Sequence, residues 1–220
     1  GVLSQERSLS FAGEAGPLIH DAAAKLCWVG HGVFISAFNP ADGEKKAEIT
    51  LEGIGRPVAM VAEANGPRLF VITTPANEVI VIDREKKEIA ARWPIADRAP
   101  SALALDDVNG LLFVATRSPA RVLVIDTATG KTTCTVEGPT EPGSMWYDPW
   151  LRKVYVAGNQ GKVGVFQQVS RERIMPLHTE TTTPGARTSL HIPAHRRLIV
   201  AAPNLGDSEA ARLFIYQIGP

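Results

Sequence analysis

Short hydrophobic stretches alternate with polar turns along the whole chain, and their spacing predicts strands. Five of these stretches read LCWVG, LFVIT, LFVAT, VYVAG and LIVAA, and each is followed after a loop by a similar one, such as VIVID. Runs of β-branched and aromatic residues bounded by Gly, Pro, Asn and Asp are typical of strands. The 3.6-residue period of amphipathic helices does not occur. The pattern therefore predicts an all-β protein.

A unit of 40 to 43 residues repeats five times. It is marked by Pro17, Pro57, Pro100, Pro142 and Pro184, which are spaced by 40, 43, 42 and 42 residues. The unit that begins at Pro100 contains four predicted strands joined by short turns. Four-stranded units with this period indicate β-propeller blades, which stack because one such sheet cannot bury both of its faces alone. We predict a five-bladed β-propeller.

The five blades are expected to form one domain over residues 1–220. The predicted blades are residues 17–56, 57–99, 100–141, 142–183 and 184–220. The fifth unit has three predicted strands, whereas the residues before Pro17 supply a stretch in the position of a fourth. We expect residues 7–13 to pair with the last blade and close the ring, because closure removes an exposed sheet edge.

Short acceptor side chains recur at the predicted turns. Asn39, Asp83 and Asp126 each follow a third strand, and such residues bond nearby backbone N–H groups in hairpin turns. We interpret them as turn residues and not as catalytic acids. The same interpretation applies to the acidic residues that follow the first strands, namely Asp21, Glu63, Asp106 and Asp148.

The repeat also carries a family resemblance. From Pro100 to Lys131 the chain follows the pattern P-x-x-apolar-turn-L-aromatic-V-A, then V-apolar-V-I-D-T-A-T-G-K, with further copies at 57–83 and 142–167. This pattern resembles the YVTN-type repeat of lactonase-like β-propellers. The resemblance implies a propeller and favours a periplasmic or cell-surface location, because many such proteins are exported. Members are often seven-bladed, so we carry over no catalytic residue from them.

Composition narrows the possible partners. Lys plus Arg and Asp plus Glu each number 23, so the net charge is zero and the basic excess of a nucleic-acid-binding surface is missing. No apolar run reaches the length of a membrane-spanning helix. Two cysteines, Cys27 and Cys134, are predicted to be strand thiols. We expect a monomer whose partner is a protein or small molecule, with no nucleic acid, no transmembrane segment, no cofactor and no metal.

The usual catalytic motifs are missing from the sequence. It contains no GxSxG nucleophile elbow, no HExxH helix and no phosphate-binding GxxxxGK[ST] loop. We therefore predict a non-enzymatic binding propeller and name no catalytic residue. The alternatives are a lactonase-like hydrolase, which could use a metal, and an accessory or sensor subunit of a redox enzyme.

A ligand site is expected at the end of the propeller where the second strands finish. The fifth unit has the two longest loops, 179–189 and 202–212, and Arg187 could hold a carboxylate or phosphate through two hydrogen bonds. Small residues such as Gly30 and Gly158 are expected to leave a hollow there. The predicted ligand-binding residues are His31, Arg117, Asn159, Arg187, Asn204 and Asp207.

A second candidate cluster comes from aligning the first strands of the repeats. His20, Tyr147 and His191 fall in one column, so they could converge near the axis and bind a metal or transfer protons. The alternative is that each packs against a neighbouring blade with one nitrogen bonded to the backbone. Trp150, in the turn DPWLRK, is the tryptophan that we expect to be exposed.

Overall fold

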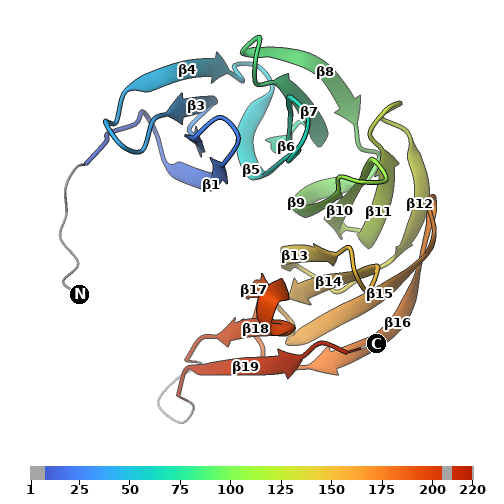
Figure 1. Ribbon diagram of the computed structural model, residues 1–220. Coiled ribbons are helices and arrows are strands. Elements are labelled where there is room, and N and C mark those ends of the chain that lie inside the picture. The colour runs from blue at the N-terminus through green and yellow to red at the C-terminus, as the bar shows by residue number, and fades with distance from the viewer. Residues whose placement is uncertain (1–7, 205–209, 220) are drawn as a thin grey trace. The chain divides into compact units, whose positions relative to one another are not determined.

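The protein is built from five antiparallel sheets that follow one another along the chain (Figure 1). The computed structural model describes residues 8–204 and 210–219. In these residues the regular structure is β-strand apart from one 3-10 turn, Pro193–His195. The sheets correspond to the blades of a five-bladed β-propeller, which confirms the predicted all-β, five-bladed fold.

Two compact units divide the chain, residues 1–94 and residues 95–220. The first unit contains two sheets, each with four strands in chain order. Sheet 1 consists of β1 (Ala15–Asp21), β2 (Leu26–His31), β3 (Phe34–Phe38) and β4 (Lys45–Thr50). Sheet 2 consists of β5 (Gly55–Ala62), β6 (Arg68–Pro75), β7 (Glu78–Asp83) and β8 (Glu88–Pro94). The assignment of residues 1–220 to one domain stays a prediction.

The second unit contains three sheets. Sheet 3 consists of β9 (Arg98–Asp106), β10 (Leu111–Ser118), β11 (Ala120–Asp126) and β12 (Thr132–Glu137). Sheet 4 consists of β13 (Pro142–Asp148), β14 (Lys153–Gly158), β15 (Lys162–Ser170) and β16 (Arg173–Thr181). Sheet 5 has three strands, β17 (Thr188–Ile192), β18 (Arg197–Ala202) and β19 (Arg212–Gln217).

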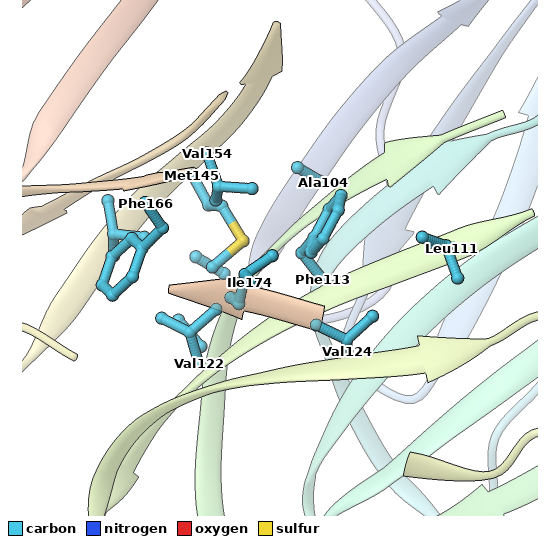
Figure 2. Packing of buried hydrophobic residues seen from close by; sticks show 12 residues of the cluster. Ala104, Leu111, Phe113, Val122, Val124, Met145, Val154, Phe166 and Ile174 are labelled. Carbon is cyan, nitrogen blue, oxygen red and sulfur yellow. The ribbon is translucent and has the colours of Figure 1, made fainter. Parts of the chain in front are cut away.

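Strand alternation gives sheet 4 two apolar faces, which are buried against different neighbours. Figure 2 shows one of these contacts, in which Phe113 of sheet 3 lies close to Met145 and Val154 of sheet 4. On the other face of sheet 4, Tyr155 packs in a cluster with Leu198 of sheet 5. Successive residues of a strand point to opposite faces, so the apolar runs read in the sequence supply both contacts.

The recurring turn residues behave as predicted. The Oδ1 atom of Asn39 accepts the N–H of Ala41 at 2.9 Å, and Oδ1 of Asp126 accepts the N–H of Thr129 at 2.9 Å. Asp83 bonds the backbone of its turn in the same way. Each carboxylate or amide replaces backbone partners that the turn cannot supply.

The strand expected over residues 7–13 does not form, because residues 8–13 are irregular and residue 7 lies outside the described residues. These residues belong to the first unit and sheet 5 belongs to the second, so closure of the ring stays a prediction. Phe11 instead packs on the His31 ring, with centroids 4.9 Å apart, and the carbonyl oxygen of Ala12 bonds Nδ1 of His31 at 2.9 Å. This aromatic and polar anchor holds the segment on sheet 1.

Candidate functional site

Arg187 and Asn159, two of the predicted ligand-binding residues, line one pocket. This pocket, of about 570 Å³, lies in the second unit where β14 and β18 end and β17 begins. We call it the Arg187 pocket, and its lining residues are Asn159, Gly185, Arg187, Thr188, Ala201, Ala202 and Pro203. The volume falls within the range of small-molecule sites, about 300–1,000 Å³.

The backbone of sheet 4 positions Arg187. Its carbonyl oxygen accepts the hydroxyl of Ser144 at 3.0 Å, and its Cβ and Cγ lie directly over Gly143. A Cβ at position 143 would come within 2.8 Å of the Cβ of Arg187, so glycine is what permits this close approach. The Cβ and Cγ atoms of Arg187 are thereby fixed, although the residue stays exposed to solvent.

Asn159 closes the other side of the pocket. Its backbone carbonyl accepts the N–H of Gly185 at 2.6 Å, which ties the loop before Arg187 to the end of β14. Its side-chain Nδ2 donates to Oε2 of Glu141 at 2.7 Å. Asn159 therefore organises the loop and keeps the nearby carboxylate engaged.

The chemistry of the pocket is determined by the Arg187 guanidinium. Within the described part of the chain, this group makes no hydrogen bond and no ion pair. A guanidinium presents paired N–H groups that match a carboxylate or phosphate in a bidentate arrangement. The pocket can thus bind an anion without breaking an existing contact of Arg187.

The other predicted ligand-binding residues do not join this pocket. Asn204 is exposed beside Pro203, Arg117 is exposed at the end of β10 in sheet 3, and Asp207 lies outside the described residues. His31 belongs to the first unit, where its side chain is buried rather than directed outward. Ala12 and Ser36 occupy its two ring nitrogens, and it lines a separate pocket of about 340 Å³ within the first unit, so its role as a ligand group stays a prediction.

The small residues at the strand ends leave less space than expected. A Cβ at Gly30 would meet Cγ of Pro57 at 2.5 Å, and a Cβ at Gly158 would meet Cβ of Pro139 at 2.7 Å. Prolines therefore fill the space directly above these glycines, although Gly30 also lines the 340 Å³ pocket of the first unit. At the end of β18, by contrast, the small residue Ala202 lines the Arg187 pocket.

The expected convergence of His20, Tyr147 and His191 is wrong for the two members in the second unit. Tyr147 faces sheet 3, with its ring 5.1 Å from that of Phe113, and its hydroxyl donates to Oε1 of Gln168 at 2.6 Å. His191 faces sheet 4, with its ring 5.8 Å from that of Tyr155. Each therefore occupies a different gap between sheets. His20 is exposed on β1 of the first unit.

His191 is held as a buried, neutral imidazole. Burial lowers the pKa of His191 below its ordinary value, although the Asp148 carboxylate opposes that shift. Nε2 of His191 lies 3.5 Å from Oδ2 of Asp148, and burial also raises the pKa of the neighbouring Tyr155 phenol. This arrangement supports packing of His191 against the neighbouring sheet, although no backbone group of the described residues bonds its ring. In the described residues, no three His, Cys, Asp or Glu side chains are grouped so that they could hold a metal ion.

Sequence reasoning missed Gly185, Thr188 and Pro203 as lining residues of the pocket, and it missed Gly143, over which Arg187 packs. The position of Pro184 explains why the sequence did not indicate these residues. Pro184 aligns with the other repeat prolines in the sequence, but in the structure it lies in a turn before β17. Thr188 pairs with Ala201, so Arg187 falls at the level of Ala202. Pro142, in the same place in sheet 4, pairs with Gly158. Arg187 thus occupies the structural position of a repeat proline.

Comparison with known proteins gives a distant relationship. The chain is 26% identical over 171 residues to the uncharacterized protein YncE of Salmonella typhi and 25% identical over 171 residues to YncE of Salmonella typhimurium. These alignments cover 74% of this chain and 48% of each relative, so the chain spans about half the length of the curated relatives it matches. No family model matches the chain. The lactonase-like resemblance therefore stays a prediction.

The described residues include no helix that is long and apolar enough to cross a membrane. Both cysteines are unpaired thiols on strands, Cys27 on β2 and Cys134 on β12, and both are half-buried.

Proposed function

We propose that this chain is a non-enzymatic propeller scaffold that binds a small anionic ligand in the Arg187 pocket. One observation carries the proposal: a guanidinium without an acceptor among the described residues lines a pocket of about 570 Å³. Two hydrogen bonds, Gly185–Asn159 and Ser144–Arg187, already hold the loop around it. Less conformational entropy is therefore lost when a ligand binds, which favours affinity.

The charge around the pocket restricts where the anion binds. Glu141 is exposed and bonds Asn159, so it places negative charge on that side. A ligand carboxylate or phosphate is therefore expected against Arg187, with its uncharged part toward Ala202 and Pro203. Ligands with one compact anionic group fit this distribution better than ligands with several.

Isothermal titration with acetate, benzoate and inorganic phosphate tests the proposal. Arg187→Ala should weaken binding of the best probe by about tenfold or more, because two charge-assisted hydrogen bonds are lost. Arg187→Lys should recover part of the affinity, and Glu141→Gln should strengthen binding a few-fold by removing a nearby negative charge.

Arg173→Ala is the matched control, since Arg173 is also an exposed arginine and lies on β16, outside the pocket. It should leave the affinity unchanged. Equal binding by the wild-type chain and Arg187→Ala, with both proteins folded, would reject the site. Periplasmic or cell-surface location and a monomeric state also remain part of the proposal, and fractionation and light scattering test them.

A further inference from the structure

A second pocket lies near the opposite end of β14, about 20 Å from Asn159 at the usual strand rise. It has a volume of about 520 Å³ and is formed by the turn after β13, the 3-10 turn after β17 and the segment after β19. Trp150 and Arg196 both line it, and Leu151, Pro193, Ala194 and Ile218 supply apolar lining. We call it the Trp150 pocket.

Trp150 is presented to solvent by a fixed turn. The residue is 84% exposed, although tryptophan is usually among the more buried residues. The Oδ1 atom of Asp148 accepts the N–H groups of Trp150 at 2.9 Å and of Leu151 at 3.0 Å. These bonds hold the backbone of the turn, so the indole is offered as a flat apolar surface on an ordered base.

Arg196 is held as firmly by its backbone. It has a φ of 48°, its N–H donates to the carbonyl of Pro193, and its carbonyl accepts the N–H of Ile218 at 2.9 Å. Its guanidinium makes no hydrogen bond or ion pair with any described residue. The neighbouring Arg197 donates to the backbone carbonyls of His195 and Arg196.

The charges of the pocket select an anion. Asp148 is the acidic member of the lining, but it is 8% exposed, and its two oxygens face backbone N–H groups and His191. The exposed charge at the rim is the Arg196 guanidinium. Indole faces attract flat rings, and guanidinium groups bind carboxylate, sulfonate or phosphate oxygens.

We propose that the Trp150 pocket binds a small molecule that combines a flat apolar ring with one anionic group. The ring packs on Trp150 and the apolar lining, and the anion pairs with Arg196. This site is separate from the Arg187 pocket in both residues and position. Its occupation therefore does not depend on the proposed function.

The test uses three probes in isothermal titrations with the 220-residue chain: naphthalene-2-sulfonate, the uncharged 2-naphthalenemethanol, and inorganic sulfate. The sulfonate should bind about tenfold or more tightly than either partial probe. Trp150→Ala should weaken sulfonate binding by about tenfold, and Trp150→Phe should restore part of it. Arg196→Asn, chosen because asparagine tolerates positive φ, should reduce sulfonate affinity to that of the alcohol.

A control variant distinguishes binding in the Trp150 pocket from binding elsewhere on the protein. Arg173→Ala, at an exposed arginine that lines neither pocket, should leave sulfonate affinity unchanged, and the melting temperatures of all variants should stay close to that of the wild-type chain. Unchanged sulfonate binding in Trp150→Ala or in Arg196→Asn overturns the proposal. So does an affinity for the alcohol or for sulfate equal to that for the sulfonate.

Discussion

A buried arginine between sheets 1 and 2 provides the sharpest test of how the first unit is held together. The side chains of Arg84 and Asp21 are 8% and 4% exposed, and they form an ion pair. Arg84 also donates through Nη2 to the carbonyl of Glu63 at 2.7 Å and through Nε to that of Pro67 at 3.2 Å. Another bond reaches the carbonyl of Gly66. One side chain thus satisfies acceptors from both sheets.

We predict that Arg84→Ala lowers the free energy of unfolding of the first unit by about 3–5 kcal/mol, because it leaves the Asp21 carboxylate buried without its cation. Arg92→Ala is the matched control. Arg92 pairs with Glu78 at 2.8 Å, but its side chain is 49% exposed, and such a pair contributes about 0–1 kcal/mol. Arg84→Met combined with Asp21→Leu should recover much of the loss, since no charge is then left buried.

The assay is urea unfolding, with hydrogen exchange of peptides from residues 8–94 to localise the change. Exchange should accelerate in β1 and β7 of Arg84→Ala and stay near wild-type in Arg92→Ala. If the two alanine variants lose the same stability, within about 0.5 kcal/mol, then burial does not determine the strength of these pairs and the reasoning fails.

Three further predictions concern packing and pH. Phe113→Ala, in the core between sheets 3 and 4, should cost about 3–5 kcal/mol of unfolding free energy in a urea titration. Gly30→Ala should cost about 1–3 kcal/mol in the same measurement, because its Cβ would overlap Pro57, which must shift. The lowered pKa of His191 means that the unfolded chain takes up the proton first as the pH falls through the ordinary imidazole value of about 6.5. Stability should therefore decline below that pH, and His191→Gln should show a smaller decline than the wild-type chain when melting is compared on both sides of it.

Local chemistry explains why the fold is predictable. Asp126 bonds its own turn, and the run around Phe113 has the composition of a strand buried on both faces. Such features depend on residues a few positions apart, and the repeat shows each of them several times. The N-terminal segment differs because its position depends on the contacts that Phe11 and Ala12 make with His31, which lies 19 residues beyond Ala12 in the sequence. No local pattern encodes those contacts.

The predicted convergence of Tyr147 and His191 is wrong for a different reason. The alignment of Tyr147 with His191 is correct, and each of them faces the preceding sheet. Equivalent residues of stacked sheets enter successive gaps between sheets, so correct alignment separates them instead of bringing them together. Alignment of repeats therefore predicts which environment a residue shares with its equivalents, and it does not predict which residues it touches.

The Arg187 pocket arises where the repeat is interrupted. At the equivalent level of sheet 4, Pro142 is buried opposite Gly158, and Pro139 fills the space beside that glycine. In sheet 5 the segment around Pro184 shifts the chain, so that an exposed arginine stands at this level above Gly143. A buried proline such as Pro142 offers no charge to a ligand, whereas the exposed Arg187 places a positive charge beside the pocket that it lines. In a repeat protein the regular spacing specifies the scaffold, and the residues that depart from it are the ones that can provide a binding site.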